Sequence, residues 1–419
     1  MSDAASVCAL SAVGLPGFAW LDGGDDGGRG IVAAWPDLEL VGDELGLLDE
    51  VERAQRDRPE ALWLGWLTYD MGAAEILGRP VQRHALPGLC LRRYPGALRL
   101  AGGVVSEVVG EGRRLADALR KVEVPPQPRW PLSPLRSQIE PGEHRRRVVA
   151  AKERIAAGDT YQVNLSQPMH AGWTDEAKRA ALPTRTADLY RLLRTRFPAS
   201  MGGLVATPLG TIVSNSPETL LHTTVGAGRD GGVLAQSWPI KGTRPRGEDP
   251  AHDAALGAEL LRSDKDAAEH VMIVDLVRND LGQLARPGSV QAPRRPSLLS
   301  LPTVHHLVSE VSATLREGVG LRELVRALFV GGSITGAPKR STVGIIDGLE
   351  THARGIYCGS LVALQPSGVT LSIAIRTGLA DADGLTLCSG GGIVIDSDPE
   401  AERLETLDKA AAFAGPATA

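Results

Sequence analysis

The sequence predicts a mixed fold of helices and strands, of the α/β or α+β class. Long segments with the periodicity of amphipathic helices are interspersed with short apolar or alternating segments that are typical of strands. The chain has 419 residues, 43% of them hydrophobic, which is enough to bury a sizeable core. No repeat at a fixed period interrupts this pattern. We therefore expect one large globular unit or two to three average domains.

A proline-rich stretch divides the chain. Residues 123–139 contain Pro125, Pro126, Pro128, Pro131 and Pro134. Such a segment cannot form a helix or a central strand, because proline lacks the backbone N–H and clashes with the preceding helical turn. We expect residues 1–122 to form an N-terminal part, residues 123–139 an extended connector, and residues 140–414 the remaining part.

The predicted elements follow in chain order. Residues 62–67 are a continuous apolar segment typical of a buried strand. After the connector, the patterns predict helices at 143–157, 256–281 and 399–413, and strands at 161–166, 355–364 and 370–379. Gly158 and Asp159 are a suitable stop for the first helix, and Asp398 with Pro399 is a suitable start for the last one.

Charge and cysteine usage exclude several classes of protein. A formal net charge of -5 argues against a nucleic-acid binder, which would carry a basic excess. No apolar run approaches the ~20 residues of a membrane span. The four cysteines form no C-x-x-C pair, which favours reduced thiols. The N-terminus lacks the basic region of a signal peptide, so we expect a cytoplasmic protein.

Lys241 lies on a turn between Pro239 and Gly242. Proline stiffens the backbone, and glycine permits close backbone approach, so the turn can present the amine to a cavity as a charge clamp or as a nucleophile. Arg244 and Arg246 follow closely, and the segment would equally suit a solvated basic turn.

Two acidic helical segments suggest a metal site. Asp266 and Glu269 share one helix face, and Glu402, Glu405 and Lys409 share another. Carboxylates from two helices could hold a hard divalent ion such as Mg²⁺. Two ordinary solvated helix faces would give the same pattern.

Several further residues suit an anionic ligand or acid–base chemistry. The segments 331–339 and 388–392 are predicted glycine-rich loops, the first before a helix that contains Pro338 in its first turn, and such loops favour anions. Arg376, on a predicted strand, could bind a carboxylate, and a desolvated Glu218 could act as a general acid. His306 could orient a leaving hydroxyl, although a buried structural histidine would fit the same pattern.

In combination, these segments resemble the chorismate-utilising enzymes, the family of anthranilate synthase component I. The matching strings, in order, are GDTYQVNLS at 158–166, SPE at 216–218, PIKGT at 239–243, AEH at 268–270, VDLVRND at 274–280, HHLVS at 305–309, GGSITGAPK at 331–339, IRT at 375–377 and GGG at 390–392. The resemblance covers residues 143–412 densely, and WLTYDMG at 66–72 extends it weakly into the N-terminal part.

The resemblance implies an α+β fold in one large unit, with two antiparallel β-sheets packed face to face and helices outside. Residues 140–414 would be the chorismate-binding catalytic region. Two positions distinguish the branches of the family. Relatives that add water to chorismate place a lysine where Gln162 stands, and anthranilate synthases usually place alanine where Lys241 stands. The chain is therefore most similar to the aminodeoxychorismate synthase branch.

The resemblance further implies roles for the residues. Lys241 would attack the ring as a nucleophile, with Glu218 as proton donor and His306 assisting. The substrate would be bound by Gly242, Thr243, Tyr357, Arg376, Lys409 and the backbone of Gly390, Gly391 and Gly392. Mg²⁺ would be held by Glu269, Glu402 and Glu405, with Asp266 close by. Because no glutamine amidotransferase portion is recognisable, ammonia would come from a separate glutamine amidotransferase subunit or from solution.

Two other activities remain open at this stage. The chain could be an anthranilate synthase component I, which releases pyruvate and makes an aromatic product, and Lys241 argues against this. It could also be a non-catalytic, chorismate-binding regulatory subunit. The presence of Glu218, Lys241, Glu269 and Glu405 argues against that alternative, because a silent subunit has no physical need for all four.

Overall fold

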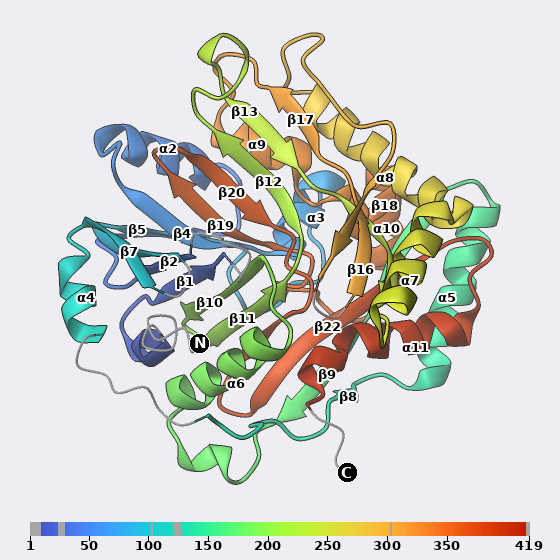
Figure 1. Cartoon of the computed structure of the whole chain (residues 1–419), viewed down its shortest axis with the longest axis horizontal. Coiled ribbons are helices and arrows are strands. Elements are labelled where there is room, and N and C mark those ends of the chain that lie inside the picture. Colours follow the sequence, from blue (N-terminus) through green and yellow to red (C-terminus); the bar gives the residue numbers. More distant parts are fainter. Residues whose placement is uncertain (1–9, 24–29, 102–103, 120–126, 302–303, 416–419) are drawn as a thin grey trace.

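The computed structural model describes residues 10–23, 30–101, 104–119, 127–301 and 304–415. Within these residues two large antiparallel β-sheets pack face to face and helices cover their outer surfaces (Figure 1). This confirms the predicted α+β class and the pair of antiparallel sheets. The beginning of the connector, residues 123–126, lies outside the described part of the chain.

The larger sheet has eleven strands in the described residues. Its strands in spatial order are β18 (Gly336–Ala337), β9 (Gln162–Gly172), β22 (Gly384–Ile393), β21 (Thr377–Ala380), β11 (Gly210–Ser216), β10 (Met201–Thr207), β1 (Ala19–Asp22), β2 (Gly30–Ala33), β6 (Gly96–Ala101) and β7 (Val104–Gly110). The short β8 (Arg136–Ser137) also pairs with β9, so the end of the connector adds to the sheet.

The second sheet has eight strands in the described part of the chain. In order they are β17 (Val311–Thr314), β13 (Leu234–Ser237), β12 (Thr219–Thr224), β20 (Gly368–Ser372), β19 (Ser360–Gln365), β4 (Leu62–Leu67), β5 (Leu89–Tyr94) and β3 (Leu38–Gly42). A small third sheet consists of β14 (Ile240–Pro245), β16 (Val304–Val308) and β15 (Ser297–Ser300). Both large sheets therefore combine strands from before and after the connector.

The helices lie mainly on the outer faces of the sheets (Figure 1). They are α2 (Leu47–Asp57), α3 (Tyr69–Leu77), α4 (Arg113–Leu119), α5 (Pro141–Ala156), α6 (Leu182–Arg196), α7 (Pro250–Arg262), α8 (Asp264–Gly282), α9 (Leu321–Leu328), α10 (Lys339–Leu349) and α11 (Pro399–Ala410). None of these described helices combines the length and the hydropathy needed to cross a membrane. Asp398 caps α11 by accepting hydrogen bonds from the N–H groups of Glu400 and Ala401, as predicted.

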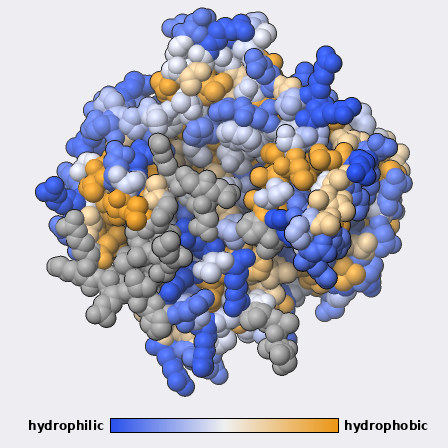
Figure 2. Space-filling view, viewed as in Figure 1, coloured by the Kyte–Doolittle hydropathy of each residue, from blue (hydrophilic) through white to orange (hydrophobic). Residues whose placement is uncertain are grey.

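The core between the two large sheets is aliphatic and aromatic. Leu64 and Trp66 of β4 pack there against Val205 and Ile212 of the opposite sheet, and all four side chains are buried. Burying such side chains contributes roughly 1.5–3 kcal/mol each. Two further clusters lie on the outer faces under the helices. In Figure 2 the visible face is largely hydrophilic, with hydrophobic areas where Figure 1 places β7 and part of α8.

Three element predictions need correction. Residues 256–281 do not form one helix, because the chain breaks at Ser263, whose hydroxyl accepts from the N–H of Asp266 and caps α8. Residues 370–379 do not form one strand, because the chain leaves the smaller sheet after Ser372 and enters the larger sheet at Thr377. The strand predicted from residue 355 begins only at Ser360, after a series of turns.

The glycine-rich segment 388–392 also differs from prediction. It is not a loop but the middle of β22, hydrogen-bonded to β9 along its length. This strand requires glycine because β9 approaches it closely: a Cβ on Gly390 would lie 2.6 Å from the backbone carbonyl oxygen of Leu165. The segment 331–339 does precede a helix, with Pro338 at the N-cap position of α10 rather than in its first turn.

Candidate active site

Lys241 lies near the start of β14, opposite Leu307 of β16. The pairing shifts register between Lys241 and Thr243, and Gly242 between them has a φ of 69°, which favours glycine. The bulge directs the Lys241 side chain toward α8, where its Nζ lies 3.7 Å from Oε2 of Glu269. Only 21% of the Lys241 side chain is exposed. The amine is therefore largely buried beside a carboxylate, and its presentation to a cavity stays a prediction.

The charged groups around Lys241 come from α8, α11 and the turn between β11 and β12. Burial is the main cause that lowers the pKa of Lys241, and the positive charge of Lys409 lowers it further. Carboxylates act in the opposite direction without reversing the shift, and they belong to Glu269, Glu218 and Glu405. A lowered pKa increases the fraction of the neutral amine, which is the nucleophilic form.

Glu218 lies in the turn between β11 and β12 and is buried. Burial raises the pKa of Glu218 to about 7, although a hydrogen bond from Ser333 and the charge of Lys241 act in the opposite direction. The hydroxyl of Ser333 donates to Oε1 at 3.1 Å, and the backbone N–H of Ile240 also donates to this carboxylate. A carboxyl group with this pKa retains a substantial protonated fraction at neutral pH, so it can serve as a proton donor.

His306 lies on β16, behind the bulge that carries Lys241. Its Nδ1 is 3.0 Å from the carbonyl oxygen of Gly242 and 3.1 Å from the hydroxyl of Thr243. Because a carbonyl oxygen can only accept, Nδ1 carries the proton and Nε2 of the neutral ring is an acceptor. Nε2 is buried and has no hydrogen-bond partner among the residues that the structure describes. Burial lowers the pKa of His306, and nearby Arg376 lowers it further, which favours this neutral form.

Two of the candidate substrate-binding side chains, Tyr357 and Lys409, lie beside Gly390 of β22. The hydroxyl of Tyr357 lies beside Gly390, 2.7 Å from where a Cβ on that glycine would stand. Lys409 of α11 donates from Nζ to the carbonyl oxygen of Gly390 at 3.4 Å. Thr243 is exposed on β14.

Arg376 is not on a strand, as predicted, but in the bend before β21, with a φ of 49°. Its side chain is half-buried, and burial lowers its pKa. The described residues offer no carboxylate within ion-pair distance of its guanidinium. A half-buried arginine without an acidic partner is a suitable site for a ligand carboxylate.

The three candidate metal ligands come from two helices, Glu269 from α8 and Glu402 and Glu405 from α11. Within the described residues no group of three or more Asp, Glu, His or Cys side chains is arranged to hold a metal ion. Instead, Glu269 faces Lys241, and Glu405 pairs with Lys409 at 2.6 Å. Asp266, expected close by, pairs with Arg244 at 3.1 Å.

Glu402 nevertheless has a feature that fits a hard cation. Its Oε1 accepts from the hydroxyl of Ser397, while Oε2 is buried, faces Gly391 and has no hydrogen-bond partner within the described part of the chain. Burial and the neighbouring charge of Glu405 raise the pKa of Glu402. The available donors are all oxygen atoms, which Mg²⁺ prefers, so the residues present fit such an ion.

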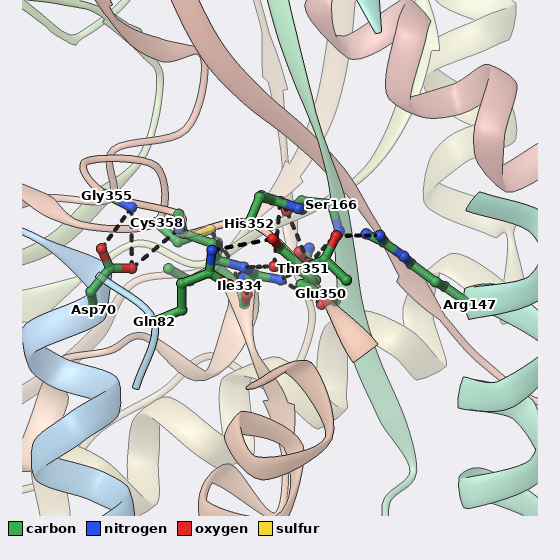
Figure 3. Close-up of polar contacts among 12 residues, drawn as sticks. Asp70, Gln82, Arg147, Ser166, Ile334, Glu350, Thr351, His352, Gly355 and Cys358 are labelled. Carbon is green, nitrogen blue, oxygen red and sulfur yellow. Dashed lines mark hydrogen bonds and ion pairs between the residues drawn. The ribbon is translucent and has the colours of Figure 1, made fainter. Parts of the chain in front are cut away.

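Sequence reasoning missed two contributors to the site. Ser333, inside the predicted loop, was not expected to bind Glu218, and its only signal was its place in a glycine-rich segment. Glu350 lies beside Ser166 of β9 (Figure 3) and forms a buried ion pair with Arg354. The pair's spacing of four residues is that of an ordinary surface pair on a helix, so the sequence carried no sign of its burial.

Comparison with known proteins identifies the relatives of this chain. A family model described as chorismate binding enzyme matches residues 32–415. Aminodeoxychorismate synthase component 1 of Salmonella typhimurium is 36% identical over 365 residues, covering 83% of this chain and 74% of that protein. An anthranilate synthase component 1 of Haloarcula marismortui is 43% identical over 268 residues, covering 64% of this chain and 52% of that protein. The chain thus spans about half the length of the latter.

The fold is also similar to a solved structure. The crystal structure of anthranilate synthase component I from Streptococcus pneumoniae matches with a TM-score of 0.75 and 25% identity, covering 92% of each chain. The likeness therefore extends over both large sheets, including the N-terminal part where the sequence resemblance is weak.

Proposed function

The chain belongs to the chorismate-binding enzymes, and from this premise we propose that it is an aminodeoxychorismate synthase component I. It converts chorismate and ammonia to 4-amino-4-deoxychorismate and water. The 4-amino-4-deoxychorismate is the precursor of 4-aminobenzoate in folate biosynthesis. The observation that carries the proposal is Lys241: a largely enclosed amine with a lowered pKa, within electrostatic reach of a carboxyl group that is partly protonated at neutral pH. The relative from Salmonella typhimurium supports the same assignment.

In the proposed reaction, the neutral amine of Lys241 forms a bond to C2 of the ring while the ring double bonds shift. The C4 hydroxyl leaves as water with the proton of Glu218. The free Nε2 of His306 accepts a hydrogen bond from that hydroxyl and orients it. Ammonia then attacks C4 and expels the amine of Lys241, and a proton lost by the new ammonium group restores Glu218. Dividing one displacement into two lowers the barrier of each.

Chorismate carries two carboxylates, and the candidate site offers cationic and polar groups for both. Arg376 and Tyr357 would bind one, together with the backbone of Gly390–Gly392. Mg²⁺ on Glu269, Glu402 and Glu405 would neutralise and orient the other. Lys409 would remain paired with Glu405, keeping that carboxylate ionised: burial by itself would raise the pKa of Glu405, but Lys409 and other lysines lower it.

We further propose that ammonia comes from a separate glutamine amidotransferase subunit. The relative from Salmonella typhimurium is called component 1, a name that supports a second component. A second candidate function is anthranilate synthase component I, which the 43% identical relative and the similar crystal structure favour.

Product identification tests the proposal. The purified chain is incubated with chorismate, magnesium and an ammonium salt, so that no partner subunit is needed, and the products are separated and analysed by mass spectrometry. We expect an amino-substituted cyclohexadiene that retains its enolpyruvyl group. Anthranilate with pyruvate would replace this proposal by the second candidate. Binding of chorismate without turnover would indicate a non-catalytic regulatory subunit.

A further inference from the structure

Strand β9 has one edge that no single strand covers. Its other edge pairs with β22 from Val163 to Gly172. On the edge in question, β18 pairs only with Gln162 and Val163, and β8 pairs only with Met169 and His170. Between these two short strands, the N–H of Asn164 donates to the carbonyl oxygen of Thr335 and the carbonyl oxygen of Pro168 accepts from the N–H of Gln138, both outside any strand. The carbonyl oxygen of Asn164 and the N–H of Ser166 have no backbone partner among the described residues.

Two charged side chains, Glu350 and Arg354, bind these two groups in place of a strand, and Figure 3 shows Glu350 beside Ser166. The N–H of Ser166 donates to Oε1 of Glu350 at 2.7 Å, and the carbonyl oxygen of Asn164 accepts from Nη2 of Arg354 at 2.8 Å. A carboxylate thus replaces the acceptor of a neighbouring strand, and a guanidinium replaces its donor.

The pair itself is rigid and enclosed. Arg354 donates to both carboxylate oxygens of Glu350, at 2.7 and 2.8 Å, and at most 2% of either side chain is exposed. The backbone N–H of Arg354 and that of Gly355 donate to Asp70, which fixes the turn that carries the arginine. A two-pronged, buried contact of this kind has little freedom to shift.

The pair also reaches the candidate substrate-binding wall. Gly390 pairs with Ser166, so the segment held by Glu350 is the one that supports the glycine strand. The guanidinium of Arg354 lies 5.6 Å from the ring centre of Tyr357, whose hydroxyl is beside Gly390. The side chain of Asn164 is also directed at Gly390, and its buried Oδ1 has no protein partner.

We propose that Glu350 and Arg354 are positioning residues for chorismate binding, and this rests on the proposed function of the site. They hold β9 in place of a strand and thereby set the positions of Gly390, Tyr357 and the Asn164 amide. Because these groups contact parts of the substrate that do not react, misplacing them weakens ground-state and transition-state binding equally. Such a loss raises KM and leaves kcat nearly unchanged.

The test uses Glu350→Gln, which keeps an acceptor for Ser166 but removes the charge, and Arg354→Lys, which keeps the charge but removes the fork. The matched control is Asp280→Asn, in a largely buried ion pair of 2.9 Å with Lys339 that does not involve β9. Equilibrium binding of chorismate is measured with magnesium and without ammonia, alongside kcat, KM and Tm. We expect both variants at the β9 pair to weaken chorismate binding about tenfold with kcat within about twofold of wild type.

The control separates positioning from general destabilisation. Asp280→Asn is expected to lower Tm but to leave chorismate binding unchanged. Unchanged binding in Glu350→Gln or Arg354→Lys, or a loss confined to kcat, would overturn the proposal whatever happens to Tm. If one of the two variants does not fold, the other is judged by the same criterion. Chorismate binding is measured without ammonia and so does not depend on which product is formed. A wild-type enzyme that makes anthranilate would therefore refute the proposed function but not the positioning role of Glu350 and Arg354.

Discussion

At the scale of single residues, burial acts in opposite directions on the two groups that the proposed reaction needs. It lowers the pKa of Lys241 and raises that of Glu218, so desolvation favours the neutral form of both. One group is then a nucleophile and the other a proton donor at the same pH. The sequence suggested both residues, but it could not give these shifts, because burial, their main cause, comes from parts of the chain that are distant in sequence.

Replacing Lys241 with alanine should remove the covalent adduct with the substrate. We expect Lys241→Ala to give no adduct mass after rapid acid quench and to lose aminodeoxychorismate formation by at least about 100-fold. The control is Lys265→Ala, because Lys265 also faces Glu269, at 4.0 Å, but its side chain is 82% exposed. An adduct of wild-type abundance in Lys241→Ala would exclude this amine as the nucleophile.

Glu218 links activity to pH and stability. Its protonated form is lost as pH rises through about 7, so wild-type kcat should fall on the alkaline side of that value. Glu218→Gln should reduce kcat by about 100-fold or more.

The same shift has a defined sign for stability. The pKa of Glu218 is higher in the folded state than in the unfolded state. The contribution of Glu218 to the free energy of unfolding is therefore fully present below the unfolded pKa, and it is lost as pH rises from that value to about 7. We therefore expect Glu218→Gln to gain stability relative to wild type on going from pH 5 to pH 8, by an amount on the order of 3 kcal/mol. Urea denaturation at both pH values measures this, and an equal difference at both would contradict the assigned pKa.

At the scale of elements, the sequence predicted the ends of helices and strands where a capping residue or an apolar segment marks them. Asp398 and Pro399 gave the start of α11, and β4 spans the predicted residues 62–67. The break at Ser263 was missed because apolar periodicity continues across it. Gly390–Gly392 were misassigned because glycine usually marks a loop, whereas here a strand needs glycine to pack closely against β9.

Gly391 offers a test of the role of β22 at the candidate metal ligands. A Cβ on this residue would lie 3.0 Å from Oε2 of Glu402, so alanine would displace that carboxylate by a few tenths of an ångström without a backbone clash. We expect Gly391→Ala to raise the magnesium concentration for half-maximal activity about tenfold.

The control for this variant is Gly348→Ala, because Gly348 lies in α10 with no atom within 4 Å of its added Cβ. Alanine there should stabilise the helix by roughly 0.5–1 kcal/mol and leave the magnesium requirement unchanged. The magnesium concentration for half-maximal activity is measured by titration of both variants. An unaltered value in Gly391→Ala would argue that Glu402 is not a magnesium ligand.

At the scale of the whole molecule, strand order was beyond local sequence reasoning. In the larger sheet β10 pairs with β1, and in the smaller sheet β19 pairs with β4, so in each sheet a block of strands from before the connector joins a block from after it. Such pairings join residues far apart in the chain, and no local pattern encodes them. The two-sheet architecture was expected only because of the family resemblance, and the Glu350–Arg354 pair, which depends on this architecture, was not expected at all.

Because the two parts share both large sheets, we predict that the N-terminal part and residues 140–414 unfold as one cooperative unit. Leu64→Ala, in the core between the sheets, should lower the stability by about 2–5 kcal/mol and shift the whole calorimetric transition. Leu209→Ala, whose side chain is exposed, should leave the transition within about 0.5 kcal/mol of wild type. Two transitions, of which only one responds to Leu64→Ala, would mean that residues 1–122 fold separately. Because both parts of the chain contribute strands to both sheets, we expect one calorimetric transition that shifts to lower temperature in Leu64→Ala.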